Sequence, residues 1–215
     1  MTQHLARLTP IAIALSLAAA AAHADVVFSD NFNDPTYGQG TVRYGNTERW
    51  GYGPSQTVTQ GAGGWNFSGV VIYVHDANSA NGAILLNERG AVNSASHLLT
   101  GLLVGQTYNL SFLMSGDNAQ GQNYGLYAWI DADLVFAEGV TVGVPGSSMG
   151  LLRDALFVAK SSTATLKFSE YTYAGSSASP VFDDVSVSSV PEPASFCLVG
   201  VGLLGLAAAR RRQTT

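Results

Sequence analysis

Hydrophobic and polar positions alternate along several short segments in the middle of the chain. In segment 106–114 every second residue from Tyr108 to Met114 is hydrophobic, and in segment 163–168 hydrophobic positions alternate with polar ones such as Lys167. A period of two residues is that of a β-strand with one buried and one exposed face. The runs that we expect to form strands are 70–74, 106–114, 124–130, 155–159, 163–168 and 181–187.

Turn-forming residues separate these runs. Gly, Asn, Ser and Pro occupy nearly every gap, and the runs recur about every ten residues, which is typical of antiparallel sheets. Only the segment 150–155 has the pattern of a helical turn. The sequence therefore predicts an all-β fold, an antiparallel β-sandwich, in residues 25–189.

The first 24 residues have the pattern of a secretory signal peptide. Arg7 precedes an apolar stretch that runs from Leu8 to Ala22, and Ala22-His23-Ala24 has the small residues that signal peptidase accepts. We expect export through the inner membrane and cleavage after Ala24.

The C-terminal segment 190–215 has three parts. A motif at 190–193 contains Pro191, Glu192 and Pro193, an uncharged run follows at 194–209, and the basic tail 210–215 begins with Arg210, Arg211 and Arg212. As a helix the run of sixteen residues would be about 24 Å long, slightly shorter than a hydrocarbon core. The arginines favour the cytoplasmic side, so the preceding domain should lie across the membrane from them. The alternative is a buried C-terminal helix.

This order of parts resembles the PEP-CTERM sorting signal of Gram-negative bacteria. The resemblance implies processing near Pro191-Glu192-Pro193 by an exosortase-type enzyme. The protein would be anchored in the membrane transiently and would then reach the cell surface or the extracellular space. By the same resemblance, such proteins associate with exopolysaccharide and biofilm.

Charge excludes one class of partner. Without its two ends the chain holds six basic and fourteen acidic residues, a formal charge of −8. Nucleic acid is not an expected ligand, because phosphate binding needs clustered Lys and Arg. The single cysteine, Cys197, falls in the apolar run, so the domain 25–189 has no disulfide.

Two segments of this domain show a second resemblance. Segments 99–112 and 181–187 are similar to the Gly-x-x-Tyr passage and the final strand of galactose-binding-like and carbohydrate-binding jelly-roll domains. In such domains a structural Ca²⁺ often joins the first strand to the last, and the matching positions here are Asp30, Asn31, Asp34 and Asp183. The alternative is that Asp30 and Asp34 are turn residues and that Asp183 caps a loop.

Aromatic side chains are the candidates for sugar binding, because a sugar ring can stack on them. In segment 124–130 the aliphatic residues should face the core, so Tyr127 and Trp129 should face outward. Trp50, Tyr52 and Trp65 lie in Gly-rich segments where they could be exposed. The alternative is that these aromatic residues close the ends of the core.

Enzymatic motifs are weak, and we expect a non-catalytic protein. Gly146-Ser147-Ser148-Met149-Gly150 matches G-x-S-x-G, but His75 and His97 both precede it, whereas the nucleophile elbow needs a later His. The sequence thus predicts an exported carbohydrate-binding or matrix-associated module. A self-associating envelope protein is the second hypothesis and a glycan-active enzyme is the third.

Overall fold

The computed structural model describes residues 24–42, 55–75, 82–86, 93–116, 123–141, 151–170 and 179–191. Val26–Ser189 forms one compact unit. Nearly all of the expected signal peptide, the expected membrane helix and the basic tail lie outside the described residues. In the described segments we find no helix with the length and hydrophobicity needed to cross a bilayer.

Strands dominate the described residues, as the alternating pattern predicts, and the all-β prediction is confirmed. The two short 3-10 helices are η2 (Pro35–Tyr37) and η4 (Ala62–Gly64). The strands are β1 (Val26–Asp30), β2 (Gly38–Val42), β3 (Ser55–Val58), β4 (Trp65–Ser68), β5 (Val71–His75), β6 (Gly82–Leu86), β7 (Ser94–Thr100), β8 (Thr107–Gly116), β9 (Asn123–Ile130), β10 (Asp133–Thr141), β11 (Leu151–Val158), β12 (Thr163–Glu170) and β13 (Pro180–Ser189).

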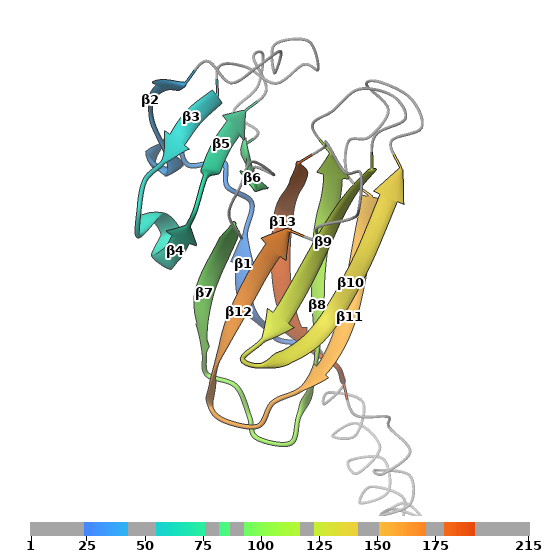
Figure 1. Cartoon of the computed structure of the whole chain (residues 1–215). Coiled ribbons are helices and arrows are strands. Elements are labelled where there is room, and N and C mark those ends of the chain that lie inside the picture. The colour runs from blue at the N-terminus through green and yellow to red at the C-terminus, as the bar shows by residue number, and fades with distance from the viewer. Residues whose placement is uncertain are drawn as a thin grey trace, which may run out of the picture. The chain divides into compact units, whose positions relative to one another are not determined.

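The described strands form two antiparallel sheets that face each other as a sandwich (Figure 1). The eight-stranded sheet has the order β11-β8-β13-β6-β5-β3-β2, and β1 also pairs with β13. The five-stranded sheet has the order β10-β9-β12-β7-β4, and β9, β10 and β12 lie toward the viewer in Figure 1. Strand β13 thus lies inside one sheet and β9 and β12 inside the other, so residues far apart in sequence share each surface.

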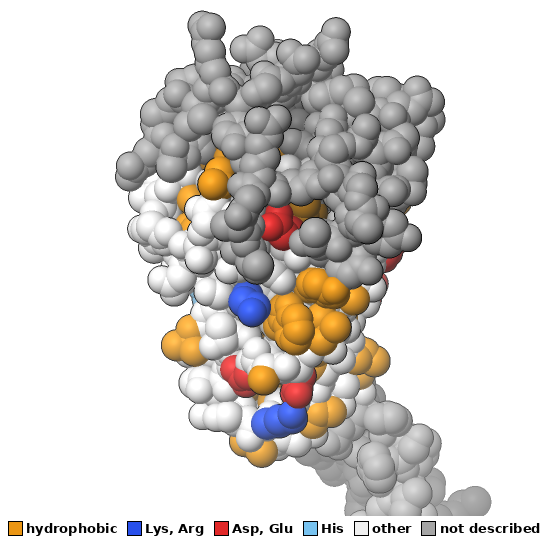
Figure 2. Space-filling model, in the orientation of Figure 1, with side chains coloured by type: hydrophobic (Ala, Val, Ile, Leu, Met, Phe, Trp, Pro, Cys, Tyr) orange, Lys and Arg blue, Asp and Glu red, His pale blue; other side chains and the backbone are white. Residues whose placement is uncertain are grey.

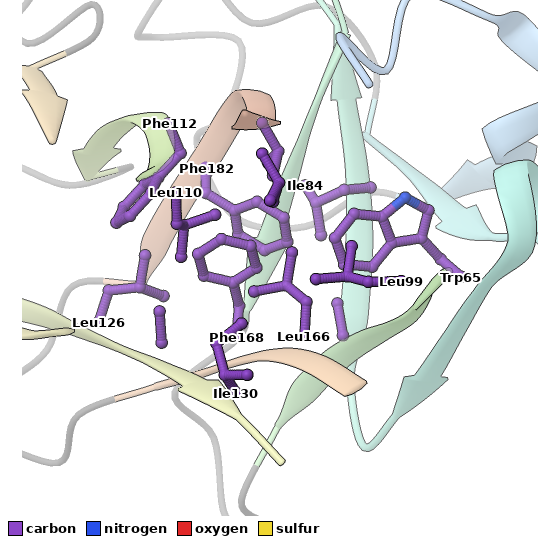
Figure 3. Packing of buried hydrophobic residues seen from close by; sticks show 14 of the residues in the cluster. Trp65, Ile84, Leu99, Leu110, Phe112, Leu126, Ile130, Leu166, Phe168 and Phe182 are labelled. Carbon is purple, nitrogen blue, oxygen red and sulfur yellow. The ribbon is translucent and has the colours of Figure 1, made fainter. Parts of the chain in front are cut away.

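Aromatic rings from both sheets fill the space between them (Figure 3). Phe168 of β12 and Phe182 of β13 stack with their ring centroids 4.4 Å apart, and both are fully buried. Trp65 of β4 packs beside them and is also fully buried. Each such side chain contributes about 1.5–3 kcal/mol by leaving water, so this layer accounts for much of the stability.

A second buried cluster lies on the opposite face of the eight-stranded sheet. Its members come from β5, β6 and β13 and are Ile72, Val74, Ala83, Leu85 and Val181. Strands β5 and β6 are therefore buried on both faces, which explains why their sequences are continuous hydrophobic runs instead of alternating ones.

One expected local structure is wrong. The segment 150–155 was expected to be a helical turn, but residues from Leu151 onward form β11 and pair with β8 over its whole length. In this strand Ala155 and Phe157 face the core, while Leu152 and Leu156 are exposed. The pairing with β8 and the burial of Phe157 override the local preference.

Candidate functional site

The outer face of the five-stranded sheet carries two aromatic side chains from β9. Leu126, Ala128 and Ile130 of this strand are buried in the core, so Tyr127 and Trp129 point the other way and are half-buried. Their rings meet edge to face, with centroids 5.9 Å apart. The prediction that Tyr127 and Trp129 face outward from this strand is therefore confirmed. Their role in sugar binding stays a prediction.

Polar groups of β12 hold this aromatic pair in place. Lys167 and Trp129 are directly opposite each other, and the Lys167 Nζ lies 5.2 Å from the Trp129 ring centroid. Ser169 lies opposite Tyr127, and its Oγ accepts a hydrogen bond from Trp129 Nε1 at 3.2 Å. The cation and the hydroxyl fix the indole orientation and leave ring surface exposed to solvent.

Strands β7 and β4 extend this surface with small polar side chains. Ser96 and Asn66 continue the row that contains Lys167, and Ser94 and Ser68 continue the row that contains Ser169. Figure 2 shows this face, where an apolar patch lies beside a basic side chain, with acidic side chains above and below it in the view. We call the two rows, from Tyr127 and Trp129 across to Asn66 and Ser68, the β9–β4 face.

The remaining predicted aromatic residues do not join this face. Trp65 was expected in an exposed loop, but it begins β4, is fully buried and donates a hydrogen bond from Nε1 to Asp30 Oδ2 at 2.9 Å. It is a core residue because β4 places it between the two sheets, so the expectation of an exposed ring is corrected. Trp50 and Tyr52 lie outside the described residues.

Asp30, at the end of β1, organises a part-buried polar cluster at the edge of the core. Its carboxylate accepts hydrogen bonds from the Phe32 amide at 2.9 Å, from Trp65 Nε1 and from the Tyr37 hydroxyl. Burial, and then the hydrogen bond to Asp30, raise the pKa of the Tyr37 phenol well above its ordinary value. The cluster fastens β1 to η2 and β4, which gives Asp30 a structural role.

Asp183 occupies a different environment on β13. Its side chain is only 8% exposed, and Oδ1 accepts a hydrogen bond from the Asp184 amide at 2.7 Å. Burial raises the pKa of this carboxyl to about 7, and the negative charges of Asp184 and Asp30 act in the same direction. A β-bulge at this point, with Asp184 at a φ of 47°, interrupts the pairing of β13 with β8.

The predicted calcium ligands do not converge as one set. In the described part of the chain, no three side chains of His, Cys, Asp or Glu come together as metal ligands. Asp34 accepts a hydrogen bond from the Thr36 amide at 2.8 Å and caps η2, and Asn31 accepts one from the Asn33 amide. Asp34 therefore acts as the turn residue of the alternative interpretation.

Asp183 alone keeps the character expected of a cation ligand, because it is a buried carboxylate without a positive partner among the described residues. An open pocket of about 380 Å³ lies beside its chain neighbour Asp184, and Asp183 itself does not line it. The lining residues of the pocket are Ser29, Asp30, Asn31, Asp184, Val185 and Ser186.

Sequence reasoning missed Lys167 and Ser169 as parts of the aromatic surface. The alternation in segment 163–168 does place Lys167 on the outer face of its strand. However, the pattern within one strand does not say which strand lies beside it. Only the register of β12 against β9 sets Lys167 opposite Trp129.

The C-terminal residues of the chain match a known family. Residues 189–212 match the PEP-CTERM protein-sorting motif. This motif implies export and transient anchoring in a membrane, with a final location at the surface or outside the cell. The match covers the sorting segment and does not include the β-sandwich.

The β-sandwich is similar to solved structures at low sequence identity. A Stig cyclase, Fisc, from Fischerella sp. TAU is 10% identical, with a TM-score of 0.51 and coverage of 80% of this chain and 100% of that one. The CBM22-1 xylan-binding domain of Xyn10C from Paenibacillus barcinonensis is 17% identical, with a TM-score of 0.48 and coverage of 80% and 99%. These similarities concern the fold alone. A search of the curated proteins found no match to this chain.

Proposed function

We propose that this protein is an exported, non-catalytic module that binds a polysaccharide on the β9–β4 face. The observation that carries the proposal is the pair Tyr127 and Trp129 on the outer face of β9, held by Lys167 and Ser169 of the next strand. An indole fixed in this way offers a flat apolar surface for stacking of a sugar ring, and the indole does not have to be ordered when the sugar binds.

The polar part of the same face suits the hydroxyl groups of a glycan. Hydroxyl and amide groups of Ser94, Ser96, Asn66 and Ser68 both donate and accept hydrogen bonds. The rows from β9 to β4 cross three strand spacings of about 4.8 Å each, or about 14 Å in total. This length favours an extended oligosaccharide over a monosaccharide.

Charge restricts the class of glycan. The exported segment has a formal charge of −8, so long-range repulsion disfavours strongly acidic polymers. Lys167 lies beside the Trp129 ring and can donate to a sugar hydroxyl. We therefore propose a neutral or weakly acidic polysaccharide, such as an exopolysaccharide of a biofilm matrix.

Binding measurements on the full chain in detergent test this proposal. Trp129→Ala should weaken binding to a responsive polysaccharide by about tenfold, because it removes the stacking surface. Leu152→Ala is the matched control, since Leu152 is exposed on the other sheet. If a broad panel of polysaccharides gives no binding, or if both variants bind like the parent, the proposed face is not a glycan site.

A self-associating envelope protein is the second candidate. Strand β11 lies at one end of the described order of the eight-stranded sheet, and Leu151 and Leu152 are exposed there. An exposed apolar edge strand favours association between copies. Light scattering in the absence of sugar separates the two candidates. Only a self-associating protein should increase in particle size as its concentration rises.

Export and processing are also part of the proposal. We infer that signal peptidase of a Gram-negative host cleaves after Ala24. An exosortase-type enzyme would then act near Pro191-Glu192-Pro193, while the run 194–209 lies in the inner membrane. Mass spectrometry of the mature protein should find Asp25 at the N-terminus and no Arg210. A mature form that retains the arginines would contradict processing.

We further propose that Ca²⁺ binds at Asp183. The support is the buried carboxylate itself, for which oxygen-preferring Ca²⁺ is a suitable counter-ion. A bound cation would supply the positive charge that this carboxylate lacks.

A further inference from the structure

Several of the most exposed large hydrophobic side chains of the described residues lie toward one end of the sandwich, although Leu152 of β11 and Leu98 of β7 are also exposed. Leu103 and Val104 are each 69% exposed, Leu156 is 65% exposed and Val26 is 63% exposed. Val158, at the end of β11, is 53% exposed. Single exposed hydrophobic residues are normal on a protein surface, but a group on one end marks a contact.

Strand register places Leu156 and Val26 in one row at this end of the sheet, with Asn109 and Ser188 between them. Leu156 lies opposite Asn109, which lies opposite Ser188, which lies opposite Val26, so this row crosses β11, β8, β13 and β1. Val158 lies opposite Thr107, the first residue of β8. The row is therefore within two residues of the point where β8 begins and β13 ends.

The loop before β8 adds Leu103 and Val104 at the same end. Its backbone is fastened, because the Leu103 amide donates to the Tyr108 hydroxyl at 2.9 Å and the Gly105 amide donates to the Ala159 carbonyl at 2.8 Å. Figure 1 shows the β7–β8 and β11–β12 loops at the end where β13 finishes. We call this group of exposed hydrophobic residues, with the loop that carries Leu103 and Val104, the apolar tip.

The chain leaves the β-sandwich at the apolar tip. Ser189, the last residue of β13, pairs with Tyr108. Tyr108 comes only four residues after Val104 in the sequence. The uncharged run starts at Ala194, so four residues separate it from Ser189. Four residues reach at most about 14 Å even when fully extended.

We infer that the apolar tip rests on the lipid bilayer while the chain is anchored, with Leu103 and Val104 in the interfacial region. The short connection limits the distance between this end and the run 194–209 when that run is anchored. A fastened loop with two aliphatic side chains can bury them among lipid headgroups without loss of loop entropy.

Apolar contact, and not charge, would carry this association. At this end Lys160 forms an ion pair with Asp133 at 2.5 Å, and Asp131 adds a further negative charge. The tip has no excess of basic residues to attract anionic lipid. Vesicles of zwitterionic phosphatidylcholine are therefore the appropriate surface.

The inference rests on the membrane anchoring that the sorting motif implies. Fluorescent labelling of the full chain in phosphatidylcholine vesicles tests both the anchoring and the contact of the apolar tip with lipid. A fluorescent probe is placed on Leu103→Cys in a Cys197→Ser background, since Cys197 is the sole native cysteine. Val70→Cys is the matched control, because Val70 is exposed but lies away from the apolar tip. Its amide donates a hydrogen bond to Asn93 Oδ1, directly before the start of β7, whereas the apolar tip follows the end of that strand. A probe on native Cys197 reports insertion of the anchor.

We expect lipid-bound quenchers to reduce the emission of the Leu103 probe at least about twofold more than that of the Val70 probe. Equal quenching at both positions would overturn the contact. A blue-shifted Leu103 probe that lipid quenchers do not reach would show that protein covers the tip instead, which also overturns it. A Cys197 probe that is not quenched would show that the anchoring itself fails, and the inference would fail with it.

Discussion

The Asp183 carboxyl gives the sharpest prediction for the metal-free protein. Its pKa rises from 3.8 to about 7 in the folded chain, mainly because the group is buried. The folded state therefore holds this proton more tightly than the unfolded state does. The stability that this provides is complete at low pH and is lost as the pH rises from about 4 through about 7.

The size of the effect follows from the two pKa values. Between pH 5 and pH 8 the free energy of unfolding should fall by about 2–3 kcal/mol from this group alone. For a domain of this length that corresponds to a decrease of about 5–10 °C in melting temperature. Burial lowers the pKa of His97, which acts in the opposite direction below pH 6.5, so a reference variant is needed.

Thermal unfolding of the full chain with a chelator, followed by circular dichroism from pH 5 to pH 8, measures this effect. Asp183→Asn keeps the acceptor for the Asp184 amide and retains His97, so the difference between the two profiles isolates the carboxyl. We expect the variant to have the flatter profile. Added Ca²⁺ should restore the melting temperature of the parent at pH 8 and leave the variant unchanged.

Superimposed profiles of parent and variant in chelator would refute the reasoning about the buried carboxyl. If the profiles differ but Ca²⁺ has no effect, Asp183 is buried as described and the proposed calcium site is wrong. The two conclusions are therefore tested separately.

Two further substitutions test the packing by thermal unfolding. Gly63→Ala should lower the free energy of unfolding by more than about 2 kcal/mol, because the new Cβ would lie 1.6 Å from the Tyr37 hydroxyl at a φ of +57°. Gly101→Ala is also at positive φ but has no atom within 4 Å, so it should lower the free energy of unfolding by only about 1 kcal/mol. Equal losses in the two variants would show that backbone strain, and not the clash with Tyr37, determines the loss of stability. Arg153→Met should cost about 1–2 kcal/mol by breaking the two-point ion pair that joins β11 to β10, and Lys160→Met, which breaks an exposed pair, should cost less than about 0.5 kcal/mol. Similar losses in both would contradict the importance of burial.

Local alternation was enough to predict several strands and their orientation. The run that becomes β8 has four inward side chains at every second position, and the run that becomes β9 points its aliphatic residues inward and Trp129 outward. These predictions hold because one face of each strand is wet and the other is not. The same reasoning could not find β6, whose residues are buried on both faces and carry no alternation.

Trp65 shows why candidate binding residues cannot be chosen by their local sequence. Three glycines precede it within four positions, which is typical of an exposed loop. In the structure that loop turns tightly through η4, and Trp65 then enters β4 between the sheets. Asp30, which binds the Trp65 indole, is thirty-five residues away, so no local pattern could indicate the contact.

The sequence by itself determined that the chain is an antiparallel β protein with a C-terminal sorting motif, because strand period and the order of motif, apolar run and arginines are properties of neighbouring residues. Tertiary structure decided which side chains meet. It set Lys167 against Trp129, buried Trp65 and Asp183, and brought Leu103 and Val104 to the end where the chain leaves the β-sandwich. These contacts depend on strand register and sheet order, which long-range packing fixes and which no short segment encodes.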